Sequence, residues 1–212
     1  MKVVLVNGSP NANGCTFTGL SIIRERLRFY CKEGLVPNIR RDKSNYRDFD
    51  ERNIKWIKSL TCLRRCVFDG DAVNTVAQAL READGIILGS AVHFASATGA
   101  ATSFFDRLFY CTEPQAKRLK FGAAIVSCRR GGASATFDQL NKYFTISQMP
   151  VVSSCYWNNI HGYTPEDVYK DEEGVRILKT LADNMAYLIK CKHQSDVAMP
   201  EALPVVMTSF IR

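Results

Sequence analysis

The first residues whose types and spacing suit a chemical role are the polar ones between Gly8 and Thr16. They follow an apolar run from Val3 to Val6 and lead into a helical pattern, so we expect a buried strand, a loop and a helix. The N–H groups that begin a helix attract anions, and neighbouring hydroxyl and amide groups add further donors. The loop therefore predicts an anion site. Its candidate binding residues are Ser9, Asn11, Asn13, Gly14, Cys15 and Thr16.

Two common phosphate-binding motifs do not fit this loop. Cys15 stands where a P-loop needs its lysine, and Gly8 and Gly14 do not give the spacing of a dinucleotide fingerprint. The loop also lacks Lys and Arg. What remains is a small phosphate monoester held by hydroxyl groups and a helix dipole, as in the flavin mononucleotide (FMN) sites of flavodoxin-like sheets. An ordinary tight strand-to-helix connection would have a similar composition.

A second loop, residues 90–99, is rich in small residues and carries a histidine and a phenylalanine. It follows an apolar strand expected at residues 84–90. In a doubly wound sheet the ligand crevice lies at the carboxyl ends of adjacent strands where the strand order reverses. The candidates for contact with a flat ring there are Ala91, Val92, His93 and Phe94. A partly exposed loop histidine without a chemical role is the alternative interpretation of His93.

A third loop, Arg129-Arg-Gly-Gly, follows the strand expected at residues 121–128 and belongs to the same edge. Gly131 and Gly132 permit close backbone approach or a positive φ. Arg129 and its neighbour offer guanidinium groups to an anionic ring edge or a nucleotide phosphate. Turn glycines and solvated arginines are the alternative. A phosphatase reading of Cys128 fails, because the required arginine is replaced by Ser134.

The composition favours one soluble domain spanning residues 1–212, which we expect in the cytoplasm. No apolar run is long enough to cross a membrane, so we expect no membrane partner. The formal net charge of +7 is spread along the chain without the aromatic interleaving of a nucleic-acid binder. We therefore expect the positive charge to attract anionic cofactors, with no nucleic-acid partner.

Eight cysteines are scattered through the chain, and we interpret most of them as buried thiols. Cys62 and Cys66 form the closest pair. A zinc or iron–sulfur site needs about four ligands, and no other Cys or His lies near in the sequence. Unligated thiols are the favoured interpretation, a redox pair is a third one, and we expect no metal site.

The periodicity predicts strands at residues 3–6, 35–41, 84–90, 121–128 and 150–155. It predicts helices at residues 17–31, 72–82, 100–110 and 137–147, and a last amphipathic helix from Val175 to Leu188. Pro37 suits an edge position for the second strand. Residues 42–58 are charged, and we assign them no structure beyond a surface excursion. Residues 156–162 mix aromatic and polar types, which is typical of a binding mouth or a subunit contact.

Four motifs in this order resemble the NAD(P)H-dependent FMN reductase family, including its iron–sulfur flavoprotein branch. They are Gly8 to Thr16, Asp84 to Arg107, Arg129 to Ala133, and Tyr156 to Gly162. The resemblance implies an α/β fold: a flavodoxin-like, doubly wound, five-stranded parallel sheet with helices on both faces. It also implies FMN with its phosphate in the first loop and its isoalloxazine ring between the second and third, and assembly into homodimers or homotetramers.

The sequence departs from the family at two places. The family often has Pro-Val-Tyr where this chain has Ala91-Val92-His93, so the resemblance does not define the exact ring contacts. Cluster-bearing members have a dense run of cysteines where only Cys62 and Cys66 stand, so we expect no iron–sulfur cluster.

The activity implied by the resemblance is hydride transfer from NADH or NADPH through bound FMN to a small-molecule acceptor such as a quinone, a free flavin or an azo compound. The cofactor carries the chemistry, so no dedicated catalytic residue is expected. The alternative is a flavodoxin-type electron carrier without nicotinamide reductase activity of its own. Such carriers usually have an acidic docking surface, whereas this chain is basic. A regulatory or scaffold protein that keeps only the fold is the third possibility.

Overall fold

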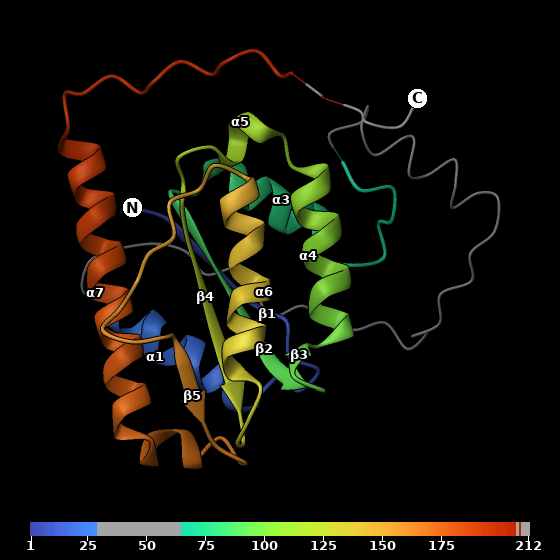
Figure 1. The fold of residues 1–212 in the computed structure, drawn as a ribbon, viewed down its shortest axis with the longest axis vertical. Helices are drawn as coiled ribbons and strands as arrows, with labels where there is room; N and C mark the ends of the chain where they lie inside the picture. The colour runs from blue at the N-terminus through green and yellow to red at the C-terminus, as the bar shows by residue number, and fades with distance from the viewer. Residues whose placement is uncertain (29–64, 207, 209–212) are drawn as a thin grey trace.

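The computed structural model of the protein describes residues 1–28, 65–206 and 208. Its sheet contains β1 (Val3–Asn7), β2 (Gly85–His93), β3 (Ser96–Ala97), β4 (Phe121–Cys128) and β5 (Asn159–His161). The order β1-β2-β4-β5 is parallel throughout, and β3 pairs antiparallel with the end of β2 (Figure 1). The strand expected at residues 35–41 and the excursion at 42–58 lie outside the described residues.

Helices cover both faces of the sheet. They are α1 (Cys15–Arg28), α3 (Val73–Glu82), α4 (Gly99–Cys111), α5 (Pro114–Lys117), α6 (Ala133–Ile146) and α7 (Glu172–Gln194), with a 3₁₀ turn, η1 (Asp167–Lys170). One core joins α1 and α7 to the sheet, and the other joins α3, α4 and α6 to its opposite face (Figure 1). Alternate residues of β1 pack into different cores. Leu5 lies in the core with α1, whereas Val4 and Val6 lie in the core with α3 and α4. This double burial explains why β1 is apolar up to Val6 and β4 is apolar up to Val126.

The doubly wound α/β architecture with helices on both faces is as expected. The strands at residues 3–6, 84–90 and 121–128 are confirmed, and so are the helices that follow them, except that residues 29–31 of the first expected helix lie outside the described residues. Four helices begin earlier than expected: α1 at Cys15, α4 at Gly99, α6 at Ala133 and α7 at Glu172, and α7 also continues past Leu188 to Gln194. Among the described residues, the parallel strands all end at the lower edge of the sheet in Figure 1, and the three candidate loops leave the sheet there.

The prediction of a strand at residues 150–155 is wrong. The chain touches β4 only briefly, where the N–H of Gly122 donates to Pro150 O (2.9 Å) and the N–H of Val152 donates to Gly122 O (2.8 Å). It then bulges outward, because the Ser154 hydroxyl bonds Tyr156 O (2.6 Å) and so satisfies the backbone locally. The Asn158 amide spans the gap to Ala124 O (3.0 Å), and pairing resumes as β5. The true strand therefore lies within the segment we expected to form a binding mouth.

In the part of the chain that the structure describes, no helix is long and apolar enough to cross a membrane.

Candidate functional site

The first loop is folded by its own side chains. The Asn7 carboxamide accepts from the N–H of Ser9 (3.1 Å), and the Ser9 hydroxyl accepts from the N–H of Asn11 (3.2 Å). The Asn11 carboxamide then accepts from the N–H of Asn13 (3.2 Å), while Asn11 O accepts from the N–H of Gly14 (3.3 Å). These turns connect the end of β1 to the first residue of α1.

The start of α1 leaves donors available. Within the described residues, no acceptor pairs with the N–H groups of Thr16 or Phe17, and the Ser9 hydroxyl hydrogen is not used by the turn. The loop contains no cationic side chain, so these dipolar donors are what it offers to an anion. This donor set fits the phosphate monoester of FMN.

The hydroxyl of Thr16 does not point into this opening, contrary to our expectation of a phosphate contact. Thr16 is 1% exposed, and its Oγ1 lies 2.6 Å from the buried Ser127 Oγ on β4. Only the backbone N–H of Thr16 therefore remains available to bind an anion. Cys15, beside it, donates its thiol to Thr164 O (3.2 Å), and burial raises the pKa of that thiol, with Asp167 adding to the shift.

The second loop is tied directly to the first. Thr98 donates its hydroxyl to Gly8 O (2.8 Å), and its N–H donates to the Ser90 hydroxyl (3.1 Å). Gly8 packs so closely that a Cβ there would lie 2.6 Å from the Cβ of Ala101. We did not expect these roles for Ser90, Thr98 or Gly8. The Thr-Gly pair before a helical pattern is a typical N-cap, and Thr98 does cap α4, accepting from the N–H of Ala101 (3.1 Å).

The rest of the second loop is a tight hairpin. β2 continues through Ala91 and Val92 to His93, and Phe94 and Ala95 turn the chain with φ values of 53° and 58°. Both residues lie in the left-handed region that non-glycine residues rarely adopt. Phe94 is fully exposed and His93 is exposed. The side chain of one α6 residue, Gln139, accepts from the Ser96 hydroxyl and the N–H of Ala97, each at 2.9 Å, and fixes the hairpin to α6.

The third loop packs against this hairpin. Gly132 has φ 89°, and a Cβ there would lie 2.8 Å from Ala95 Cα and 2.9 Å from Val92 Cγ1. A Cβ on Gly131 would meet nothing within 4 Å. Arg129 and Arg130 are exposed. The structure thus brings all three predicted loops to one edge.

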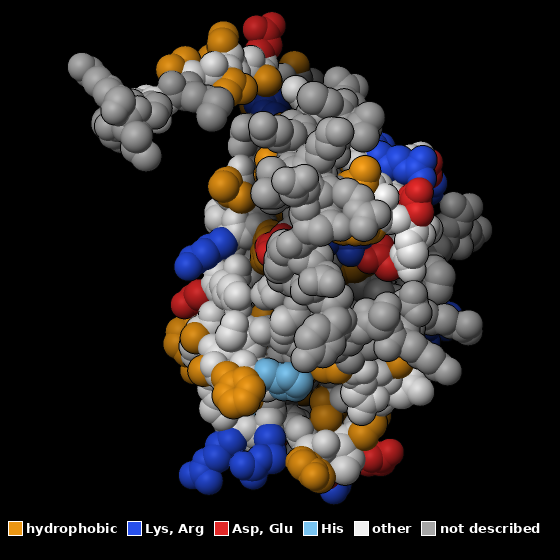
Figure 2. Space-filling model, turned by 90° about the vertical axis from the view of Figure 1, so that its right-hand side faces the viewer, with side chains coloured by type: hydrophobic (Ala, Val, Ile, Leu, Met, Phe, Trp, Pro, Cys, Tyr) orange, Lys and Arg blue, Asp and Glu red, His pale blue; other side chains and the backbone are white. Residues whose placement is uncertain are grey.

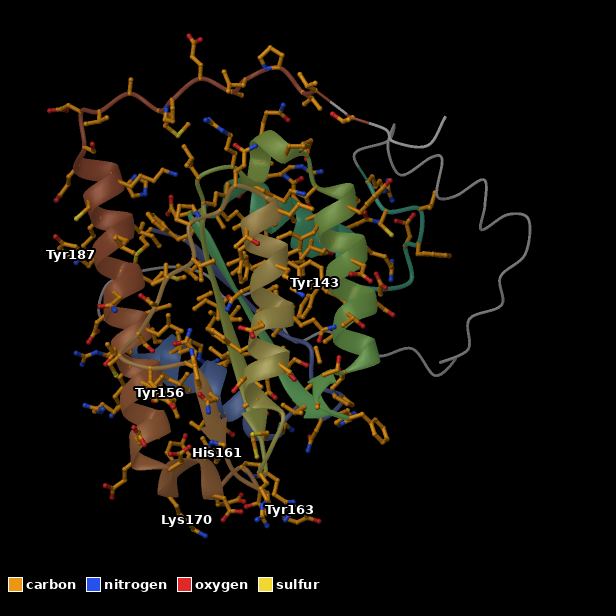
Figure 3. The ribbon with its side chains drawn as sticks, viewed as in Figure 1. Tyr143, Tyr156, His161, Tyr163, Lys170 and Tyr187 are labelled. Atoms are coloured by element: carbon orange, nitrogen blue, oxygen red, sulfur yellow. The ribbon has the colours of Figure 1, made fainter. Side chains whose placement is uncertain are left out.

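A thiol and an imidazole lie beside these loops at the β4–β5 pair. Cys128 Sγ is 3.4 Å from His161 Nδ1, and the Asn159 amide nitrogen is 3.4 Å from His161 Nε2. The N–H of His161 donates to Asp171 Oδ2 (2.7 Å), and burial raises the pKa of the Cys128 thiol. Figure 3 places His161 at the same end of the molecule as Tyr163 and Lys170.

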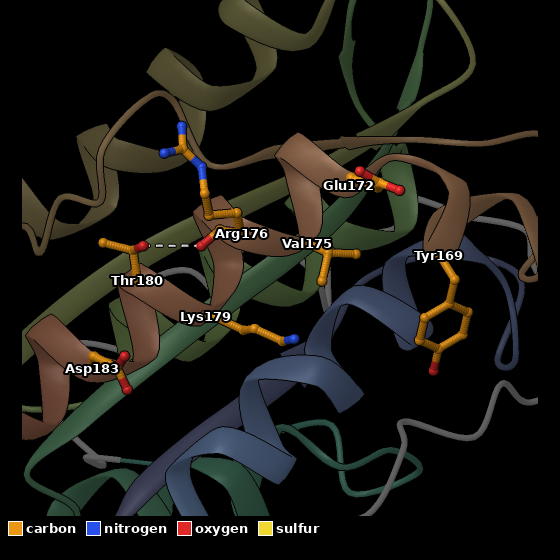
Figure 4. Close-up of a pocket in the computed structure, with 7 residues that line it drawn as sticks. All are labelled: Tyr169, Glu172, Val175, Arg176, Lys179, Thr180 and Asp183. Carbon is orange, nitrogen blue, oxygen red and sulfur yellow. Dashed lines mark hydrogen bonds between the residues drawn. The ribbon is translucent and has the colours of Figure 1, made fainter.

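Two hollows of the described surface lie elsewhere. One, of 390 Å³, runs over α7 (Figure 4) and is lined by Tyr169, Glu172, Val175, Arg176, Lys179, Thr180 and Asp183. The other, of 250 Å³, is lined by Phe17, Thr18, Ser21, Pro165, Glu166 and Tyr169. The first mixes two acidic with two basic side chains, and neither hollow is lined by the second or third loop.

A doubly wound sheet with free N–H groups in its first strand-to-helix loop, and with two further loops at the same edge, is typical of flavodoxin-like flavoproteins. Residues 1–164 match the family model for NADPH-dependent FMN reductase, and the chain belongs to this family. The fold agrees with that of a flavodoxin, the WrbA-like protein of Agrobacterium tumefaciens (TM-score 0.58, 11% identity, 90% of this chain and 98% of that chain). It also agrees with the apo form of the NADH:FMN oxidoreductase EmoB (TM-score 0.58, 17% identity, 88% of each chain).

Proteins with similar sequences fall into one long match and one short match. An iron–sulfur flavoprotein of Methanocaldococcus jannaschii is 27% identical over 202 residues, which span 90% of this chain and 98% of that protein. A much shorter match of 38 residues, 18% of this chain, is 47% identical to the HTH-type transcriptional regulator AdhR of Bacillus subtilis and covers 27% of it. The long match is to a flavoprotein, in agreement with the family assignment.

Proposed function

We propose that the protein is an FMN-dependent NAD(P)H oxidoreductase that reduces a small-molecule acceptor of the quinone, flavin or azo type. The observation that carries this proposal is the joining of three loops at the carboxyl edge, with free N–H groups at the start of α1. Membership of the FMN reductase family supports it. The protein's role as an oxidoreductase follows from the family, whereas the acceptor and the choice of nicotinamide belong to the proposal.

The first loop would hold the FMN phosphate through the Ser9 hydroxyl, the side chains of Asn11 and Asn13, and the backbone from Gly14 to Thr16. The ring would lie along the hairpin and the third loop, which supply the small residues Ala91, Gly131 and Gly132. Bound FMN supplies hydride chemistry between the nicotinamide and the acceptor. The residues of this chain bind and orient the reactants, and their backbone groups set the polarity around the ring.

The runner-up is a flavodoxin-type carrier that receives electrons from a separate reductase. The formal net charge of +7 disfavours it, because an acidic docking surface is usual for such carriers.

The deciding measurement is the visible spectrum of the protein reconstituted with FMN, followed without oxygen during titration with NADH and with NADPH. Bleaching of the flavin by either nucleotide, and recovery of colour on adding a quinone, is the expected result. A stable flavin spectrum that neither nucleotide bleaches would favour the carrier. Failure to bind FMN would contradict both functions.

Assembly is part of the same proposal. Tyr156 and Trp157 on the bulge before β5 are 56% and 53% exposed, and their rings lie 5.1 Å apart. Figure 3 shows Tyr156 beside α7, on the outer surface. We propose a homodimer, or a homotetramer built from it, in which this pair contacts a second subunit and helps to close the site.

A further inference from the structure

Past the end of α7 the chain continues as an extended tail, residues 195–206. The tail forms no helix or strand, and Figure 1 shows it leaving the upper end of α7 and crossing the top of the molecule. All of its residues are exposed, and Figure 2 shows hydrophobic side chains in orange along the same upper end. Its large apolar side chains are 62–88% exposed: Val197, Met199, Leu203, Val205 and Val206.

The composition of this tail does not suit permanent exposure to water. Segments that stay in solvent are typically polar and highly charged. Between residues 196 and 206 the charged residues are Asp196 and Glu201, and all the others are apolar residues or prolines. Within the described residues, one hydrogen bond joins the tail to the body of the protein, from Arg118 Nη2 to Glu201 O (3.3 Å). The fold of a single chain therefore leaves an apolar segment uncovered.

A surface of matching chemistry lies on the bulge before β5. The rings of Tyr156 and Trp157 are about half exposed, and they are inclined at 54° with their centroids 5.1 Å apart. The bulge is fixed to α7, because Asn184 Nδ2 donates to Ser153 O (2.8 Å). Extended segments that contain proline dock on aromatic surfaces, because the proline rings pack against the aromatic rings and the stiff segment loses little entropy. The tail contains two prolines, Pro200 and Pro204.

The tail of the same chain does not lie on this aromatic pair. Figure 3 places Tyr156 beside the lower half of α7, whereas the tail starts at the upper end and is held there by Arg118. Both charges of the tail are negative and the chain carries a formal net charge of +7, so a second copy attracts the tail. Exchange between two copies covers two tails and two aromatic pairs, on the order of 1,600 Å² in total, the standard size of a stable interface.

We propose that residues 196–206 are an arm that docks Pro200, Leu203 and Pro204 onto the Tyr156–Trp157 pair of a second copy of this chain. In a two-fold dimer each subunit gives one arm and receives one. The inference rests on the homodimer of the proposed function and names the segment that its aromatic pair contacts. Its test measures association and needs neither FMN nor a nicotinamide, so the arm and the oxidoreductase activity can fail independently.

The first measurement is the dissociation constant of the full-length protein, from sedimentation velocity over a concentration series. We expect Leu203→Asp to weaken the dimer by about tenfold or more, because a carboxylate then enters an apolar contact. Leu203 is exposed in a single chain, so the substitution leaves the fold intact. The matched control is Ile146→Asp at the end of α6, a residue that is 86% exposed and belongs to neither the arm nor the aromatic pair.

A mixing experiment decides whether the arm docks on the other subunit. The Leu203→Asp variant keeps the aromatic pair, and the Trp157→Ala variant keeps the arm. An equimolar mixture of the two should dimerise more tightly than either variant alone, because the heterodimer regains one intact contact. Three results would overturn the inference: a monomeric wild type, a wild-type dissociation constant for Leu203→Asp, or no gain in association on mixing.

Discussion

At the scale of single residues, two hydroxyls of one short loop have different roles. The Ser9 oxygen accepts a backbone N–H within the turn, and its own hydrogen remains available. The Thr16 hydroxyl is buried against Ser127, where it joins α1 to β4. Both residues suit a phosphate loop by type, but only the hydroxyl of Ser9 is placed so that it could donate to a ligand.

Replacing Ser9 by alanine should weaken FMN binding by about 1.5–3 kcal/mol, because a hydrogen bond to a charged phosphate oxygen is lost. Fluorescence titration of the apoprotein with FMN measures the change. Ser195→Ala, at the far end of α7, is the control and should bind FMN normally. Equal affinity in the wild type and Ser9→Ala would place the phosphate elsewhere.

Replacing Thr16 by valine should lower the free energy of unfolding by about 1–3 kcal/mol, because the buried hydroxyl of Ser127 loses its partner. Urea unfolding of the apoprotein measures this loss, and Thr16→Ser, which keeps the hydroxyl, should be much less affected. If Thr16→Val unfolds like the wild type but binds FMN poorly, its hydroxyl contacts the phosphate after all.

At the scale of elements, the connection from β4 to α6 decides how the second and third loops meet. Gly132 combines a positive φ with backbone contact to the hairpin, whereas Gly131 has open space around it. The hairpin is held on its other side by Gln139 of α6. The end of β2, the hairpin and α6 thus fix one another, and the shape of the proposed ring site depends on their packing.

We expect Gly132→Val to lower FMN occupancy and to destabilise the fold by about 1–3 kcal/mol, through strain at its left-handed φ. The added side chain would also push Ala95 and Val92 away. Gly131→Val has open space for its Cβ and is the matched control for stability alone, because Gly131 also belongs to the proposed ring site. Occupancy from the absorbance ratio of flavin to protein, together with thermal unfolding, measures both effects. Full flavin content and normal turnover in Gly132→Val would separate this loop from the cofactor.

At the scale of the whole molecule, exposed aromatic residues and cysteine placement set the expected assembly and cofactor content. Tyr156 and Trp157 form an aromatic pair on a polar bulge. Within the described residues, no three His, Cys, Asp or Glu side chains are grouped to hold a metal ion. Cys62 lies outside the described residues, and Cys66 is buried, where Arg107 donates to its sulfur (3.0 and 3.3 Å).

We expect a dimer at micromolar concentration, and Trp157→Ala should weaken it by about tenfold or more, since buried interface tryptophans contribute strongly to association. Sedimentation velocity over a concentration series measures the dissociation constant. Tyr163→Ala removes another exposed aromatic ring, 81% exposed, and serves as the control. A fully active wild-type monomer would contradict the assembly that we propose.

Protein purified without oxygen should be yellow and contain no stoichiometric iron, although several relatives are iron–sulfur flavoproteins. A cluster needs about four thiolate ligands in one place. Within the described residues the cysteines are free thiols, and none belongs to a group of three possible metal ligands: Cys15, Cys66, Cys111, Cys128, Cys155 and Cys191. Metal analysis by plasma mass spectrometry tests this, and about four irons per chain would refute it.

Much of the fold was predictable from sequence, because continuous apolar runs mark parallel strands buried on both faces. The rule that such strands end at one edge then brought Ser9, His93 and Gly132 to the same side. The strand at 150–155 was misplaced, because the run Pro150 to Val152 is apolar but Ser154 satisfies the following backbone itself.

The local sequence pattern predicted most of the strands and helices along the chain and the edge at which the three candidate loops lie. Tertiary structure decided which groups face that edge. Thr16 and Ser127 are 111 residues apart and meet only because of how α1 packs on β4. Gly132 requires its positive φ because the hairpin lies against it. Contacts of this kind depend on strand register and helix packing, which distant residues set together and which no single stretch of sequence encodes.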